Sequence, residues 1–199
     1  MTGARPLGRR LRRLAPDRRG VTAVEFALIT PALLMAVMGL MDMAYQAYAQ
    51  AVLEGAVQKA GRDSGIESAS PSTIDGKVAA QIRAVIANAQ VTTTRKSYTS
   101  FGTVAPERFT DANNNGVRDP GECYDDVNGN KMWDADPGLT GQGGASDITL
   151  YSVSVSYKRL FPLAALIGWS PTISLSAQTL LKNQPYATQA IPTVQNLCN

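Results

Sequence analysis

The chain has 199 residues, of which 44% are apolar and 18% charged, and its formal net charge is +3. This length suits one modest domain with an appendage. The absence of histidine excludes His-based catalytic triads and His-ligated zinc sites. The sequence contains no glycine-rich phosphate loop and no paired-cysteine metal motif, so we expect no enzyme activity.

The basic residues are concentrated at the N-terminus. Residues 1–19 carry seven arginines against one carboxylate, Asp17, whereas the rest of the chain is net acidic. Arginines directly before an apolar run are typical of a cytoplasmic flank under the positive-inside rule. We therefore expect a basic cytoplasmic leader over residues 1–20 and no nucleic-acid partner.

A long apolar segment follows the leader. Between Val21 and Met41 the only formally charged side chain is Glu25, and about twenty helical residues cross a bilayer core of ~30 Å. The pattern predicts a single helix over residues 21–62, with one transmembrane segment over about 21–43. Everything beyond this segment would lie outside the cytoplasm. A disulfide between Cys123 and Cys198 is chemically permitted there, and two free thiols are the alternative.

Glu25 needs an explanation, because a charge inside a membrane helix is costly. A plain uncleaved anchor would place Glu25 near the cytoplasmic interface. A secretory signal peptide would be cut after the "AYA" of residues 47–49, which leaves Gln50 as the first residue. Cleavage after Gly20 would place the new amino group of Val21 one helical turn from Glu25. The two charges would then neutralise each other, within one subunit or between neighbours.

The stretch "RRGVTAVEFALITPALL" resembles the N-terminus of a TadE-like minor pilin, or pseudopilin, of the tight-adherence (Tad/Flp) pilus system. The matching features are the basic leader, Gly20 before the cut, Glu25 at the fifth mature position, Phe26 after it, and the long apolar helix. The resemblance implies that a prepilin peptidase cuts between Gly20 and Val21. It also implies that Glu25 and Phe26 belong to the motif used in recognition or assembly.

The same resemblance implies a location and partners. The chain would cross the bacterial inner membrane once, with a cytoplasmic N-terminus and residues 63–199 in the periplasm or outside the cell. Its partners would be the prepilin peptidase, other Tad pilins and the inner-membrane assembly platform, and its role would be to support the assembly of adhesive pili. The alternative is an extracytoplasmic Ca²⁺-binding or adhesion module on an uncleaved anchor or an ordinary signal peptide.

Residues 63–199 predict an extracytoplasmic α+β domain. A linker over residues 63–76 precedes apolar residues at helical spacing, which indicate a short helix within residues 77–90. Three later runs have strand character: Val91–Phe101, Ile148–Leu160 and Thr172–Leu181. The expected fold class is therefore α+β and pilin-like, with a long N-terminal helix, a short helix and a small, mainly antiparallel sheet.

Residues 111–138 form an acidic, Asn- and Gly-rich insertion. Its first half fits a twelve-residue loop of the EF-hand type, with oxygen ligands for Ca²⁺ from Asp111, Asn113, Asn115, the Val117 carbonyl, Asp119 and Glu122. Its second half offers Asp126, Asn128, Asn130, the Met132 carbonyl and Asp134 in the same order. Gly129 stands at position 4 there instead of 6, and the closing ligand would be Asp136 or come from elsewhere. A structural Ca²⁺ is one interpretation, and a turn cluster without metal is the other.

Overall fold

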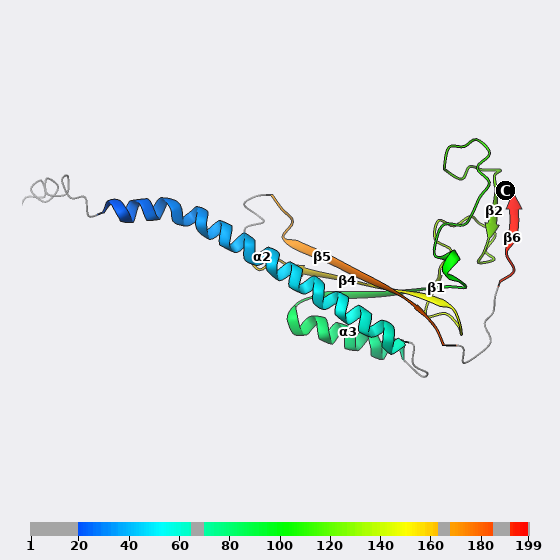
Figure 1. Ribbon diagram of the computed structural model, residues 1–199, viewed down its shortest axis with the longest axis horizontal. Coiled ribbons are helices and arrows are strands. Elements are labelled where there is room, and N and C mark those ends of the chain that lie inside the picture. The colour runs from blue at the N-terminus through cyan, green and yellow to red at the C-terminus, as the bar shows by residue number, and fades with distance from the viewer. Residues whose placement is uncertain (1–19, 65–69, 163–167, 185–191, 199) are drawn as a thin grey trace, which may run out of the picture. The chain divides into compact units, whose positions relative to one another are not determined.

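The computed structural model describes residues 20–64, 70–162, 168–184 and 192–198. The expected leader lies outside the described residues, except for Gly20. The chain divides into two compact units, one of Met1–Tyr45 with Leu160–Ser170 and one of Gln46–Arg159 with Pro171–Asn199. The second unit holds the α+β fold that the sequence predicts (Figure 1).

Helix α2 spans Val21–Ser64 and confirms the long N-terminal helix. It continues through Pro31, whose missing N–H removes one intrahelical hydrogen bond without ending the helix. Its two parts differ in their surroundings. Nearly all side chains before Met38 are exposed, whereas one face of the later part is buried: Ala49, Leu53, Ala56, Val57 and Ala60. This spacing is that of an amphipathic helix lying on a core.

Helix α3 spans Pro71–Val85 and therefore begins six residues earlier than the sequence predicts. Part of the expected linker is helical because Pro71 occupies the first turn, where its fixed φ and missing N–H are favourable. Ile74 then adds a further buried position one turn before Val78 and Ile82. The helix also ends earlier than predicted, because residues from Gln90 onward pair as a strand.

The main sheet has four antiparallel strands in the order β3-β1-β4-β5. Three of them confirm the predicted strands with small shifts at their ends: β1 at Gln90–Tyr98, β4 at Ile148–Lys158 and β5 at Thr172–Lys182. The two-residue strand β3, Leu139–Thr140, pairs with the end of β1 and was not predicted. A short 3-10 helix, Phe101–Thr103, follows β1.

The two faces of this sheet have different roles. On β4, Tyr151, Val153, Val155 and Tyr157 are all buried, as their alternation with serines predicts. The later part of α2 and all of α3 lie against this face (Figure 1), and a Cβ at Gly61 of α2 would stand 3.2 Å from the Thr179 side chain on β5. The core therefore lies between the two helices and one face of the sheet.

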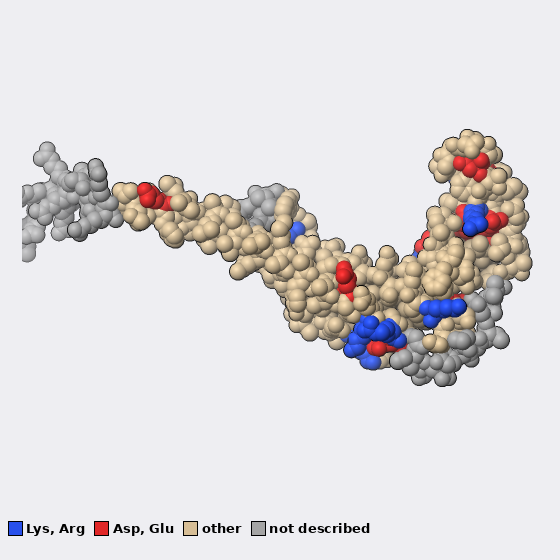
Figure 2. Space-filling view, in the orientation of Figure 1, with Lys and Arg blue, Asp and Glu red and all other residues tan. Residues whose placement is uncertain are grey.

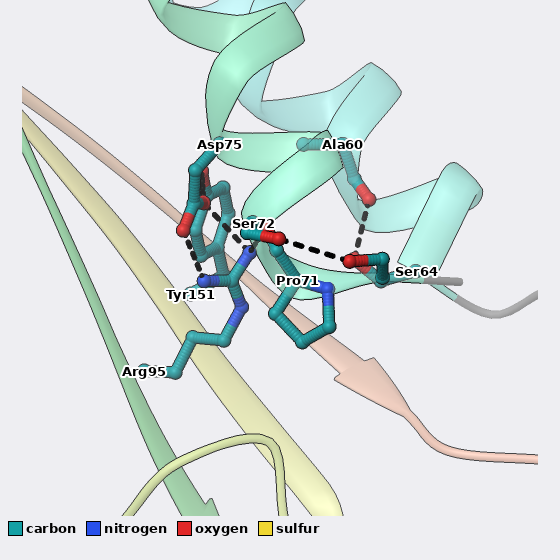
Figure 3. Close-up of polar contacts among 8 residues, drawn as sticks. Ala60, Ser64, Pro71, Ser72, Asp75, Arg95 and Tyr151 are labelled. Carbon is teal, nitrogen blue, oxygen red and sulfur yellow. Dashed lines mark hydrogen bonds and ion pairs between the residues drawn. The ribbon is translucent and has the colours of Figure 1, made fainter. Parts of the chain in front are cut away.

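A partly buried polar cluster holds α3 on this face (Figure 3). Asp75 of α3 accepts hydrogen bonds of 2.8 and 2.7 Å from the Arg95 guanidinium on β1 and one of 2.7 Å from the Tyr151 hydroxyl on β4. Arg95 also lies over the Tyr151 ring, 4.4 Å from its centre. Burial and the hydrogen bond to Asp75 raise the pKa of Tyr151, so that its hydroxyl remains a donor.

A second sheet of two antiparallel strands was not predicted. It pairs β2, Cys123–Asp126, with β6, Gln195–Cys198, and an isolated bridge joins Phe109 to Tyr124. Cys123 and Cys198 stand opposite each other in this pairing and form a disulfide bond. The alternative of two free thiols is therefore wrong in this structure, and the C-terminal tail is tied to the acidic insertion.

Candidate functional site

The predicted processing residues lie at the start of α2. Gly20 precedes the helix, Val21 is its first residue, and the Val24 N–H donates to the Gly20 carbonyl at 3.1 Å. Val21 and Phe26 are 50% and 67% exposed, and Glu25 is also exposed. One helical turn separates Val21 from Glu25 along the same face, as the sequence predicts.

Gly20 has open space around it. A Cβ built there would meet no other atom within 4 Å, and its φ is not in the left-handed region. Neither close packing nor an unusual backbone conformation of this chain therefore requires glycine at this position.

The first part of α2 is long and apolar enough to cross a membrane, and none of its apolar window is buried within the chain. Figure 2 shows this part as an uncharged surface with one acidic patch near its beginning, and Glu25 is the only charged residue between Val21 and Met41. Its exposed side chains include Leu28, Ile29 and Leu33. A helix that is exposed and apolar all round is consistent with a membrane anchor or a signal segment.

The first Asp/Asn loop, residues 111–122, folds around its own carboxylates. The Asp111 oxygens accept from the N–H groups of Asn115 and Gly116 at 3.1 and 2.7 Å. Asp119 accepts from the amide groups of Asn113 and Asn115 at 2.7 and 2.8 Å. Gly116, with φ +77°, supplies the left-handed turn that the pattern requires at position 6.

Glu122 closes this loop as the residue at position 12. Its two carboxylate oxygens accept from the Ala112 N–H at 2.8 Å and from the Asp119 N–H at 3.0 Å. It is 8% exposed, although the loop around it is largely on the surface. Glu122 therefore links position 2 of the loop to position 9.

The second loop begins at Asp126 and repeats this hydrogen-bond pattern. Asp126 accepts from Asn130 and Lys131 at 3.2 and 2.9 Å, and Asp134 accepts from the amides of Asn128 and Asn130 at 2.8 and 2.6 Å. Lys131 at position 6 has φ +63° and takes the backbone conformation of Gly116 in the first loop. The displaced glycine of the sequence pattern therefore does not change the course of the backbone.

The closing residue of the second loop is Glu107, which sequence reasoning missed. Its carboxylate accepts from the Val127 N–H and the Asp134 N–H, both at 2.9 Å, so that it links positions 2 and 9 as Glu122 does in the first loop. Glu107 is 3% exposed, and the Trp133 indole N–H donates to its backbone carbonyl at 2.8 Å. No spacing rule identifies it, because it precedes the loop in the sequence.

Asp136, the alternative that the sequence suggested, has another role. It accepts from Tyr98 at 2.8 Å and forms an ion pair with Lys96, both on β1. Burial and the hydrogen bond to Asp136 raise the pKa of Tyr98 to about 12. Asp136 thus joins the insertion to the main sheet and takes no part in the loop.

The donor set of the two loops is mixed. Among the described residues, no group of three or more Asp, Glu, Cys or His side chains converges as a metal site. Each loop instead combines two Asp and one Glu with two Asn side chains, and the N–H groups of Val117 and Met132 donate to Asn115 and Asn130 at 2.7 and 2.8 Å. In this arrangement, the Asn amide groups donate to the carboxylates of Asp119 and Asp134, which reduces the repulsion between negative charges.

A family model described as TadE-like protein matches residues 20–62. The segment begins at Gly20 and ends near the end of α2, so it contains the apolar part of this helix and the residues of the predicted processing motif. The chain is therefore TadE-like over this segment, and the resemblance that the sequence indicates is confirmed. No curated protein and no solved structure matches the chain.

The match over residues 20–62 suggests a link to the Tad pilus. TadE-like proteins are generally non-enzymatic components of this pilus system. The chain is thus TadE-like over residues 20–62, which suggests a Tad pilus-associated protein, and its exposed apolar helix suits a membrane.

Proposed function

We propose that this chain is a minor pilin of the TadE type, which a prepilin peptidase cuts between Gly20 and Val21 and which supports the assembly of adhesive Tad pili. The observation that carries this proposal is the open position of Gly20 directly before an exposed apolar helix with Glu25 near its start. A peptidase needs close access to the backbone, and glycine provides it. The family match over residues 20–62 supports the same conclusion.

Glu25 gains a partner when the chain is cut. The new ammonium group of Val21 and the Glu25 carboxylate lie one turn apart on the helix, within one subunit or between neighbouring subunits. Pairing offsets the cost of holding either charge alone in a low-dielectric environment. Phe26, 67% exposed beside Glu25, is available for recognition by the peptidase or by another pilin.

The charges and the disulfide support one orientation of the chain in the membrane. Seven arginines before the helix favour a cytoplasmic N-terminus in the bacterial inner membrane. The disulfide between Cys123 and Cys198 suits an oxidising compartment, which supports a location of residues 63–199 in the periplasm or outside the cell. The inner-membrane assembly platform and other Tad pilins are then the expected partners.

N-terminal sequencing of the mature protein tests the processing step. The proposal expects the sequence "VTAVEF" in cells that contain the peptidase. Gly20→Leu should leave the leader attached, whereas Gly55→Leu, at an exposed helical glycine with equally open space, should be cut normally. An intact "MTGARP" start or a first residue at Gln50 would contradict the proposal and favour the anchored or secreted binding module.

We further propose that each Asp/Asn loop holds a structural Ca²⁺ ion. The supporting observation is that the two loops share one hydrogen-bond pattern, including a glutamate that bridges positions 2 and 9, although one glutamate lies within its loop and the other precedes it. The oxygens of two Asp, two Asn, one backbone carbonyl and one Glu match the six to eight ligands that Ca²⁺ takes. Binding would require the Asn amide groups to turn their oxygens toward the ion.

A further inference from the structure

The segment between β4 and β5 differs from the rest of the second half of the chain. Leu160–Ser170, with the sequence "LFPLAALIGWS", contains no charged residue and follows directly after Lys158 and Arg159. Its described residues, 160–162 and 168–170, belong to the compact unit that contains α2 through Tyr45, and not to the unit of the strands that the segment connects. This grouping associates a second apolar segment with the apolar part of α2.

The described ends of this segment expose large apolar side chains. Leu160 is 52% exposed and Trp169 is 54% exposed, and Phe161 is half-buried. On α2 within the same unit, the positions that are shielded beyond Thr30 are Met38, Gly39, Asp42 and Tyr45, which lie on one face at the end of the apolar run. Between Pro31 and Tyr45, α2 is therefore shielded only near the end at which it would leave the bilayer.

We propose that Leu160, Phe161 and Trp169, here called the β4–β5 patch, contact the headgroup region of the same membrane that α2 crosses. This inference rests on the proposed membrane anchoring of α2. Tryptophan is enriched at this depth of a bilayer because its ring is apolar and its N–H polar. An apolar run of this length is too short to cross and suits an interfacial position.

The basic residues next to the β4–β5 patch favour a membrane with anionic lipids as its binding partner. Lys158 and Arg159 adjoin the apolar residues, and residues 148–199 contain no Asp or Glu at all. Basic side chains near the surface are attracted to anionic headgroups, while their aliphatic stems pack along apolar surface.

The two tryptophans of the chain allow a matched test in vesicles of phosphatidylcholine and phosphatidylglycerol. In the full chain carrying Trp133→Phe, Trp169 is the only tryptophan, and lipids brominated near the headgroup end of the acyl chain should quench its emission. In the Trp169→Phe chain, the remaining Trp133 lies against Phe109 in the acidic insertion and should not be quenched. If the Trp133→Phe chain does not fold, the quenching of the unaltered chain is compared with that of the Trp169→Phe chain, and the difference gives the contribution of Trp169.

Two further measurements separate the possible outcomes. Lys158→Gln with Arg159→Gln should reduce the quenching of Trp169 in vesicles that contain phosphatidylglycerol. If the chain resists alkaline extraction but its Trp169 is not quenched, the β4–β5 patch is overturned and the anchor stands. The same conclusion follows if Trp169 is shielded from the lipids by a second chain that can be cross-linked to it. Extraction of the chain from the vesicles at high pH would overturn both the anchor and the patch.

Discussion

Arg95 on β1 donates two hydrogen bonds to the Asp75 carboxylate on α3, and the side chain of Arg95 is only 9% exposed. Tyr151 on β4 adds a third bond to the same carboxylate. One carboxylate thus joins α3 to two neighbouring strands, and the helix is held by a polar contact as well as by the apolar residues beneath it. Removing Asp75 would leave a buried guanidinium without its partner.

We predict that Asp75→Asn lowers the free energy of unfolding at neutral pH by about 2–3 kcal/mol, because it removes charged hydrogen bonds from a buried arginine. Burial alone would raise the pKa of Asp75, but the hydrogen bonds from Arg95 and Tyr151 and the charge of Arg95 outweigh it, so the pKa lies below its usual value. The stabilisation is therefore complete above the ordinary carboxyl pKa and is lost as the pH falls through the lowered one. Urea unfolding of both proteins from pH 7 to pH 2 measures this difference, and a constant difference would contradict the prediction.

The disulfide closes a large loop, since Cys123 and Cys198 are 75 residues apart in the sequence. We predict that replacing both by serine destabilises the β2–β6 pairing and costs up to about 4–5 kcal/mol in the chain-entropy treatment. Hydrogen exchange at Tyr124 and Leu197, which pair across these strands, should become much faster, while exchange in β4 should change little. Equal acceleration in both sheets would show that the disulfide stabilises the whole unit instead.

If the loops bind Ca²⁺, the melting temperature of the protein should rise when Ca²⁺ is added. At a Ca²⁺ concentration one hundred times the Kd, the stabilisation of ~2.7 kcal/mol raises the melting temperature of a chain of this size by about 5–10 °C per site. Glu107→Gln and Glu122→Gln should each remove part of this increment, and the double variant all of it, because each glutamate serves one loop.

Glu54→Gln is the control for this series, since Glu54 is exposed on α2 and bonds only with the Gln50 amide among the contacts described. It should retain the full increment. Identical melting of the unaltered chain with Ca²⁺ and with a chelator would refute the metal in both loops.

Glu25→Gln tests the role of the carboxylate apart from cleavage. An unpaired buried charge costs about 3–5 kcal/mol, so the lone ammonium of Val21 should reduce assembly of the mature subunit more than tenfold. Pili sheared from cells measure assembly, and the N-terminal sequence of the cell-bound protein measures cleavage. Normal pilus yield from Glu25→Gln would argue against the charge pair, and Glu54→Gln again serves as the control on the same helix.

Much of this protein is determined by local sequence. The helix from Val21, the alternation in β4 and the turns of the two Asp/Asn loops depend on residues a few positions apart, and the structure bears out each of them. The second loop lacks glycine at position 6, but its backbone follows the same course, because Lys131 adopts the left-handed conformation that Gly116 has in the first loop. The start of α3 was missed although Pro71 marks it, since the polar residues before Val78 suggested a linker.

Only the tertiary structure decided which distant residues meet. The closure of the second loop by Glu107, the pairing of β2 with β6 and the clamp of Asp75 by Arg95 join segments that no periodicity relates. Their energy comes from burying carboxylates and strand edges together with their partners, so it exists only once the core has formed. The N-terminal motif is the opposite case, because the exposed helix with Gly20 and Glu25 at its start is determined by consecutive residues and contacts no distant part of the described chain at these positions.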